Sequence, residues 1–306
     1  MASRNLKNRI KSTKNIRQMT RAMEAVSAVK MRRSVALALS SRPYVLAALR
    51  ILRDIRARLN GEVITSPYFK TKPVGRTILV VITSDKGLAG PFNASVINKT
   101  DKIIASHESE VKVVAIGKKG RDYYRRKGVL LDEFLGVGDF GAVHETAPIA
   151  NRLARFFLSG EAEEIKIIYT NFLSALKQEV VVRTILPMKT ETIEEIAANI
   201  KPERGPYKLQ FEPVSGEADT SPIILEPNPE TLLEKLGPAL LEIEIHQAIL
   251  EANASEHSSR MLAMKSASEN AAELADNLTI FYNKTRQAGI TKELTEITAG
   301  REALEN

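Results

Sequence analysis

The stretch whose residue types come closest to a binding or catalytic motif is "SDKGLAGPFN" (Ser84–Asn93), which directly follows the apolar run "TILVVIT" (Thr77–Thr83). A glycine-bearing turn after a buried strand is where nucleotide-binding domains hold phosphate. A P-loop, however, needs the pattern G-x-x-x-x-G-K-[ST], and here Gly87 and Gly90 stand three residues apart without a following Lys-Ser/Thr pair. The motif for nucleotide cleavage is therefore incomplete.

Other residues of the same stretch favour a structural turn. Pro91 removes a backbone N–H that a phosphate cradle would use, and the dinucleotide fingerprint G-x-G-x-x-G lacks its first glycine. We interpret Gly87 and Gly90 as a tight strand-to-helix turn in which Ser84 and Asp85 satisfy backbone amides of the loop. A nucleotide-dependent enzyme built on this loop stays open as an alternative.

The sequence contains no other pattern of catalytic or metal-binding residues. The chain has no Cys, which excludes thiolate metal sites and cysteine nucleophiles. There is no nucleophile elbow and no H-E-x-x-H motif. The four histidines are far apart and have no second ligand at metal-binding spacing: His107, His144, His246 and His257. We expect a chain that is not an enzyme by itself and that holds no cofactor and no metal.

Charge is distributed unevenly along the 306 residues, whose net charge is +7. Residues 1–58 contain fifteen Lys and Arg against two acids, whereas residues 230–306 contain seven against thirteen. The two ends can therefore attract each other electrostatically. The basic first segment also leaves a coiled-coil nucleic-acid-binding or scaffold protein as an alternative, although the low aromatic content argues against nucleic-acid binding.

Both ends of the sequence have the composition of long helices. Residues 1–42 contain neither Gly nor Pro, and we expect a helix over 1–60 that Pro43 kinks or interrupts. No proline follows Pro238, so a second long helix is expected over 230–306. Apolar and small residues recur at heptad spacing and should form the seam of an antiparallel coiled coil: Ile16, Met19, Met23, Val26, Ala267, Ala271, Leu274, Leu278, Phe281, Thr285 and Ala288.

A different pattern lies between the two helices, over residues 76–190. Short β-branched runs alternate there with helical segments, which is typical of an α/β domain with a parallel sheet. The expected elements are strands at Thr77–Thr83, Val111–Gly117, Glu164–Thr170 and Val180–Leu186, with helices at Asn93–His107 and Pro148–Gly160. Seven of the thirteen prolines fall from Pro187 to Pro229, so residues 191–229 are predicted to be a linker or an extended return segment.

Three stretches resemble signature motifs of the gamma subunit of F-type ATP synthases. They are "LKNRIKSTKNIRQMTRAMEAVSAVKMRR" (Leu6–Arg33), the central "SDKGLAGPFN", and "YNKTRQAGITKELTEI" (Tyr282–Ile297), and they follow the family's order. The chain departs from the family's pattern at Ala89-Gly90-Pro91, at Gly289, and where Arg301 follows Gly300. The resemblance covers essentially the whole chain and implies N- and C-terminal helices of a long coiled coil flanking an inserted Rossmann-like α/β domain.

This resemblance also implies a function. The family's gamma subunit is a rotating central stalk that does not cleave nucleotide itself and that transmits torque between the membrane and the catalytic head. The implied partners are the alpha and beta subunits of the head (one gamma per three alpha and three beta), the epsilon subunit and the ring of c subunits, without nucleic acid. The implied beta-subunit contacts are Met23, Arg286, Gln287, Thr291 and Glu293, and Glu226 is assigned to the foot near epsilon and the c ring.

Location follows from composition and from the resemblance together. We find no apolar run in the sequence that approaches the ~20 residues of a membrane-spanning helix. The first forty residues are Arg-rich and acid-poor like a transit peptide, but their helical pattern continues well beyond them. We expect a bacterial protein that is peripheral to the cell membrane on its cytoplasmic side and is held there only through its complex.

Overall fold

The computed structural model describes residues 2–58, 66–71, 73, 75–107, 109–140, 143–188 and 228–305. The predicted foot residue Glu226 and nearly all of the predicted linker lie outside the described residues. The chain divides into two units: a helical unit made of Met1–Ser27 with Arg260–Asn306, and an α/β unit made of Ala28–Ser259. Each unit is described by itself below.

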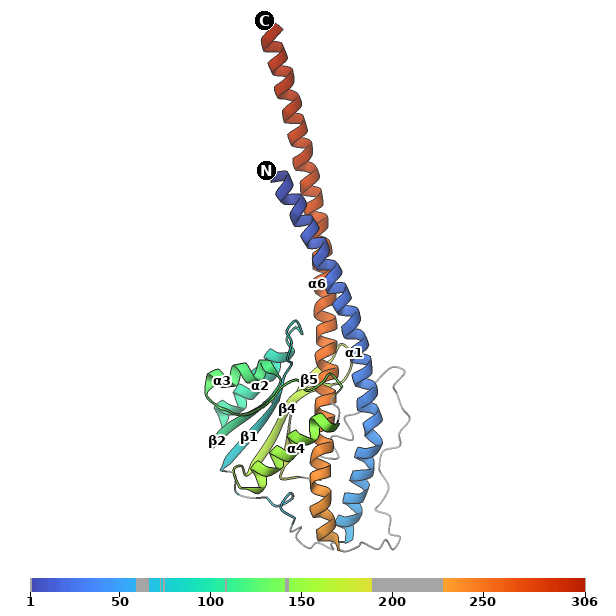
Figure 1. Cartoon of the computed structure of the whole chain (residues 1–306), viewed down its shortest axis with the longest axis vertical. Coiled ribbons are helices and arrows are strands. Elements are labelled where there is room, and N and C mark those ends of the chain that lie inside the picture. The colour runs from blue at the N-terminus through green and yellow to red at the C-terminus, as the bar shows by residue number, and fades with distance from the viewer. Residues whose placement is uncertain are drawn as a thin grey trace. The chain divides into compact units, whose positions relative to one another are not determined.

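Two long helices account for both ends of the chain (Figure 1): α1 spans Ala2–Arg58, and α6 spans Pro229–Glu305. We expected Pro43 to kink or interrupt this helix; an interruption is wrong, because α1 continues through Pro43. A proline inside a helix costs about 3 kcal/mol. After Pro43, α1 buries Ala48, Leu52 and Ile55 in the core of the α/β unit, and a fully buried Leu or Ile contributes about 1.5–3 kcal/mol. This packing is sufficient to offset the cost of the proline.

In the helical unit, the first part of α1 and the last part of α6 run antiparallel (Figure 1). The expected α1 seam is largely wrong, since Ile16, Met19 and Val26 are 50%, 66% and 56% exposed. The buried positions are instead Thr13 and Ser27. Small side chains occupy these buried positions because they let two helix backbones approach more closely than Ile or Met would allow.

The α6 side of the seam is mostly built from small residues. Ser268, Ala271 and Ala275 are buried there at heptad spacing, and Met264 is the one large side chain among these buried positions. Of the expected seam residues, Ala271 is buried and three are half-buried, namely Ala267, Leu278 and Thr285. The expectation is wrong for the remaining three, Leu274, Phe281 and Ala288, which are exposed. Several large apolar side chains on both helices, such as Ile16, Met19 and Phe281, are thus exposed in this unit.

The α/β unit contains a five-stranded sheet in the order β3-β2-β1-β4-β5 (Figure 1). The first four strands of this order are parallel, but β5 is antiparallel to β4, which corrects the expectation of a parallel strand there. The β4–β5 connection is too short for a crossover helix, and a parallel pair needs one. The strands are β1 (Arg76–Ile82), β2 (Glu110–Ile116), β3 (Leu130–Phe134), β4 (Glu164–Phe172) and β5 (Gln178–Leu186).

Helices cover both faces of this sheet, and alternate residues of β1 face opposite sides. Ile78, Val80 and Ile82 belong to the core shared with α4 (Val143–Leu158) and with the α/β-unit parts of α1 and α6. On the opposite face, β1 packs with α2 (Phe92–Ser106) and α3 (Lys118–Lys127). The sequence had not indicated β3 or α3, because "LLDEF" and "KKGRDYYRRK" are rich in charge.

Candidate partner-binding surface and carboxyl edge of the sheet

The loop after β1 lies at the carboxyl edge of the parallel strands, where α/β domains usually bind ligands. The Ser84 N–H donates to the Asn93 Oδ1 atom at 2.9 Å, and the Ser84 hydroxyl donates to the Lys86 carbonyl at 2.5 Å. Gly90 has a left-handed φ of 53°, as a tight turn requires, whereas the second left-handed residue is Leu88 at 62° and not Gly87. The backbone at Ser84 and Gly90 thus has the geometry of a tight turn between β1 and the helix that follows it.

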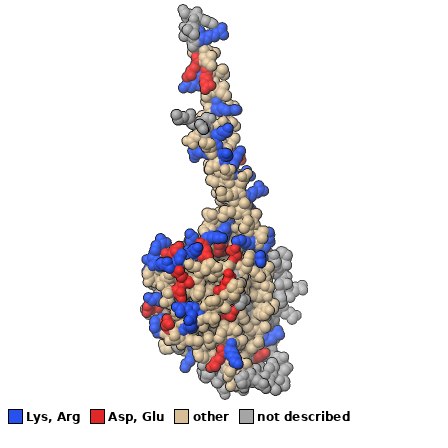
Figure 2. Space-filling model, viewed as in Figure 1, with Lys and Arg blue, Asp and Glu red and all other residues tan. Residues whose placement is uncertain are grey.

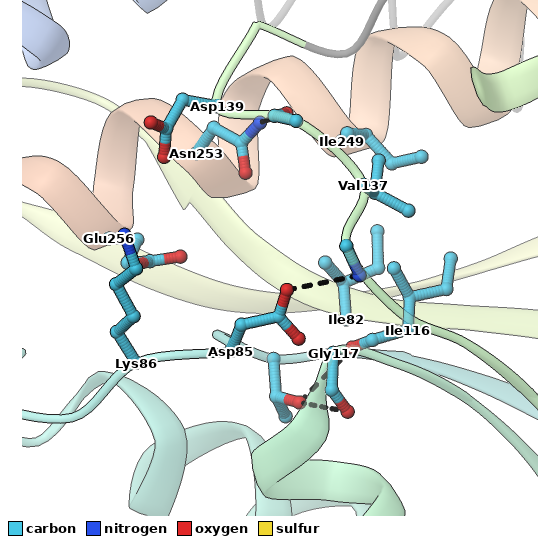
Figure 3. A pocket seen from close by; sticks show the side chains of 13 residues that line it. Ile82, Asp85, Lys86, Ile116, Gly117, Val137, Asp139, Ile249, Asn253 and Glu256 are labelled. Atoms are coloured by element: carbon cyan, nitrogen blue, oxygen red, sulfur yellow. Dashed lines mark hydrogen bonds between the residues drawn. The ribbon is translucent and has the colours of Figure 1, made fainter. Parts of the chain in front are cut away.

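Asp85 fills the position in which a phosphate would be expected (Figure 3). Its Oδ1 atom accepts the Lys118 N–H at 2.9 Å, and its Oδ2 atom accepts the Gly136 N–H at 3.1 Å. Lys118 is the first residue of α3, and the free amides of a helix N-terminus are a ready anion site. The protein's own carboxylate therefore takes this role. The amides that Asp85 accepts are not those of its own loop, as we expected, but those of the first residue of α3 and of Gly136 in the loop after β3.

The adjoining β1 and β2 loops are packed too tightly to admit a ligand between them. A Cβ atom on Gly117 would lie 2.0 Å from the Thr83 carbonyl oxygen, and Gly117 has a φ of +94°. The Thr83 hydroxyl accepts the Gly120 N–H at 2.8 Å and donates to the Ile116 carbonyl at 3.1 Å. Gly117 thus gives α3 its close approach to β1, and no sequence motif had singled it out.

The cavity that remains at this edge has a volume of about 190 Å³, below the range of about 300–1,000 Å³ typical of small-molecule sites. Its charged lining consists of the carboxylates of Asp85, Asp139 and Glu256 with the ammonium of Lys86, which extends toward Glu256 (Figure 3). A phosphate would meet more negative than positive charge. Size and charge both disfavour a nucleotide here.

The helical unit, by contrast, exposes large apolar side chains. On α1 these are Ile16, Met19 and Val26, and on α6 they are Leu274, Ile280, Phe281, Ile290, Leu294 and Ile297. Clusters of exposed apolar side chains mark protein-interaction surfaces. Lys and Arg side chains lie among the other residues of this unit (Figure 2).

The end of α6 is exposed on all sides. Every residue from Arg286 to Ala299 is exposed, including Leu294 and Ile297 at 59% and 68%. Isolated helices of this length are marginal in water, because most helix stability in proteins comes from tertiary packing. The tip of α6 is therefore the part of the described chain best suited to bind another protein.

Comparison with known proteins decides the family. A family model described as ATP synthase matches residues 2–304. The chain is 36% identical to the ATP synthase gamma chain of Moorella thermoacetica over 98% of both chains. It is 38% identical to that of Roseiflexus castenholzii over 99% of this chain and 98% of the relative. The chain belongs to the ATP synthase gamma chain family.

Solved structures show the same fold. A chain in the Euglena gracilis mitochondrial ATP synthase structure of OSCP, F1 and c-ring matches with a TM-score of 0.66 and 18% identity, over 99% of this chain and 94% of that one. The fold class expected from sequence, an α/β domain with long terminal helices, is thereby confirmed. These comparisons do not support the nucleic-acid-binding alternative.

The structure places the beta-contact residues implied by the resemblance on the two helices of the helical unit. Met23 is half-buried on α1, whereas Arg286, Gln287, Thr291 and Glu293 are all exposed on the tip of α6. At about 100° per residue, Arg286 and Glu293 share one face of the tip, and Gln287 and Thr291 share another. All four are free to bind a partner. Their binding to a beta subunit stays a prediction.

Two properties of the described residues concern metal ions and membranes. No group of three or more His, Cys, Asp and Glu side chains there could hold a metal ion. Within Asn5–Leu52, one stretch is long and apolar enough to cross a membrane by composition, contrary to our expectation, and 33% of it is buried in the protein. Core helices of soluble proteins meet the same criterion, so composition alone does not assign this helix to a membrane.

A buried polar network in the α/β unit was not anticipated from the sequence. The Tyr169 hydroxyl donates to the Glu251 Oε2 atom at 2.8 Å, the Gln247 amide donates to Glu251 Oε1 at 3.1 Å, and the Ser41 hydroxyl donates to Gln247 Oε1 at 2.6 Å. The Arg183 guanidinium donates to the Tyr169 hydroxyl. The network thus joins β4, β5, α1 and α6.

Burial dominates the electrostatics of this network. It raises the pKa of the Tyr169 hydroxyl well above its usual value, and the nearby Glu251 carboxylate adds to the rise. Burial also raises the pKa of the Glu251 carboxyl, against the opposing charge of Arg183. A usable sequence signal did exist, because Glu244 and Glu251 are seven residues apart on the apolar face of α6 with Leu240, Leu241 and Ala248.

Proposed function

We propose that the chain is the central rotating stalk of a bacterial F-type ATP synthase and transmits torque between the c-subunit ring and the catalytic head. The observation that carries this proposal is the match to ATP synthase gamma chains over 98% or more of this chain. The proposed partners are the alpha and beta subunits, the epsilon subunit and the c ring. The chain reaches the membrane only through this complex, on its cytoplasmic side.

The chain itself is proposed to be non-catalytic. Its only resemblance to a nucleotide site was the loop after β1, and there the Asp85 carboxylate holds the amides of Lys118 and Gly136. The cavity at that edge is small and its lining is acidic. ATP chemistry would then belong to the surrounding subunits of the head.

Torque transmission requires a stiff shaft with different faces. The part of α6 in the helical unit, Arg260–Glu305, is about 69 Å long at 1.5 Å per residue. One helix pair inside a ring of three-fold symmetry presents a different face to each beta subunit. Since a partner's conformation shifts only through differential contacts, turning this asymmetric shaft would drive the beta subunits through their states in sequence.

We further propose that residues 1–60 and 230–306 are the two arms of the shaft and that 76–190 is the α/β domain. Met23, Arg286, Gln287, Thr291 and Glu293 are proposed to contact beta subunits. For the helix tip, this contact would cover side chains of Arg286–Ala299 that are exposed in the chain alone. Glu226 keeps its proposed place in the foot.

The test begins with gentle isolation of the tagged chain from native membranes and measurement of what co-purifies. We expect one copy with three alpha-like and three beta-like subunits and with ATPase activity. Arg286→Ala and Gln287→Ala should then weaken assembly or turnover while the isolated chain stays folded. Lys265→Ala, at an exposed position of α6 within its paired part, is the matched control. Purification of the chain alone or with nucleic acid would contradict the proposal.

Met23 provides a test that separates coupling from assembly. Met23→Lys places a charge on α1 that can capture an acidic partner loop, so ATP-driven proton pumping should fall more than ATP hydrolysis does. Pumping and synthesis at wild-type rates would remove Met23 from the proposed contacts.

A further inference from the structure

The loop between β3 and α4 is tied to both long helices within the α/β unit. The Asp139 carboxylate accepts a hydrogen bond from the Lys30 ammonium of α1 at 2.5 Å. The other oxygen of the same carboxylate lies 3.3 Å from the His257 Nε2 atom of α6, a contact that is an ion pair when the imidazole is protonated. One side chain of the α/β domain thus bridges the two helices.

The backbone around Asp139 is anchored to the same helices. The Ser34 hydroxyl of α1 donates to the Asp139 carbonyl at 3.2 Å, and the Asn253 amide of α6 donates to the Gly138 carbonyl at 3.1 Å. On α1, the Arg33 guanidinium stacks over the Phe140 ring at 4.0 Å from its centroid. Three consecutive residues of the loop therefore contact a long helix.

The bridge lies in a partly desolvated position. His257 has a side-chain exposure of only 3%, while those of Lys30 and Asp139 are 32% and 39%. Burial opposes ionisation of the Asp139 carboxyl, but the Lys30 hydrogen bond and the charges of His257, Lys30 and Lys86 together hold its pKa below the usual value. The carboxylate is accordingly charged at neutral pH, when its bond to Lys30 is charge-assisted.

These directional contacts add to an attachment of sheet to helices that is largely apolar, and apolar burial is non-directional, so it resists separation more than sliding. The buried network around Tyr169 and Glu251 is a second directional attachment, made through β4 and β5, whereas the Asp139 bridge attaches the loop between β3 and α4. The bridge also lies close to the end of the α/β unit, since Lys30 and His257 are each two positions inside its limits at Ala28 and Ser259.

We propose that Asp139 is a positioning residue that locks the α/β domain against both helices, so that the domain turns with the shaft under load. This role rests on the proposed function as a rotating stalk. A domain that slipped on its helices would let the head hydrolyse ATP without driving the c ring, so the loss should appear in coupling before it appears in hydrolysis.

Asp139→Asn tests the bridge without changing the size of the side chain. In the isolated full-length chain we expect amide exchange of residues 136–140 to rise about tenfold, the scale of one lost charge-assisted hydrogen bond. In the complete complex in sealed vesicles, we expect hydrolysis to stay within about twofold and the ratio of proton pumping to hydrolysis to fall as the opposing gradient grows. The double variant Asp139→Asn with Lys30→Met should raise the amide exchange of residues 136–140 little more than either change alone.

Asp132→Asn is the matched control, because Asp132 pairs with Arg152 at 2.7 Å inside the α/β domain, and neither residue belongs to α1 or α6. Unchanged exchange in Asp139→Asn would overturn the bridge itself. Raised exchange with an unchanged pumping ratio, or an equal loss in Asp132→Asn, would overturn its role in coupling. Failure of the wild-type chain to assemble with a catalytic head would instead overturn the proposed function, and the coupling role with it.

Discussion

Glu244 gives a prediction whose size can be worked out from the structure. Its side chain is 4% exposed on α6 beside Leu240, Leu241 and Ile245, and its Oε2 atom has no hydrogen-bond partner among the described residues. Burial raises the pKa of its carboxyl from 4.5 to about 8, against the opposing charge of Arg183. The folded chain therefore keeps a proton that the unfolded chain releases.

The sign of the pH dependence follows from this difference. Below pH 4.5 both states hold the proton, and the carboxyl has no effect on the free energy of unfolding. Between about pH 4.5 and pH 8 only the folded state holds it, so stability falls by about 1.4 kcal/mol per pH unit. From pH 5.5 to pH 8, Glu244 should lower the free energy of unfolding by about 2–3 kcal/mol.

Glu244→Gln removes the titration but keeps the shape of the side chain. We would measure the free energy of unfolding of the full-length chain by urea titration and circular dichroism at pH 5.5, 7 and 8. From pH 5.5 to pH 8, the free energy of unfolding of the variant relative to that of the wild type should rise by about 2–3 kcal/mol. Glu234→Gln, an exposed position of α6, should follow the wild type. Parallel pH curves for wild type and Glu244→Gln would refute the assignment of a buried proton to this carboxyl.

Three further predictions concern local structure. Gly117→Ala places a Cβ 2.0 Å from the Thr83 carbonyl oxygen and should lower the free energy of unfolding by at least about 3 kcal/mol. Gly128→Ala, with φ +72° and open space around the new Cβ, should lower it by about 1 kcal/mol. Equal losses for the two variants in urea titration would contradict this. Asp85→Ala leaves the Lys118 and Gly136 amides unpaired and should lower the free energy of unfolding by about 1–3 kcal/mol. In thermal melts, added formate should restore part of this loss in Asp85→Ala but should not stabilise the control variant Asp122→Ala. Gly289→Ala meets nothing within 4 Å and should stabilise the helix tip by about 1 kcal/mol; unchanged amide exchange from Arg286 to Ala299 would contradict it.

The order of the parts and most of the helices and strands could be predicted from the sequence. Absence of Gly and Pro over residues 1–42 indicated the N-terminal helix, and β-branched runs indicated β1, β2, β4 and β5 to within two residues at either end. Such signals are local, since backbone preferences and breakers act within a few residues. The incomplete P-loop pattern likewise indicated a turn before any contact was known.

Tertiary structure decided what depends on distant partners. The heptad pattern favoured Ile16 and Met19 for the seam, but close helix packing selected Thr13 and Ser27. Pro43 stays helical because residues far along the chain bury the helix around it. Asp139 pairs with Lys30, 109 positions away, and no local signal marks such a pair, because an ion pair depends on distance in space and on burial. The strands and helices were therefore readable from the sequence, whereas their contacts were not.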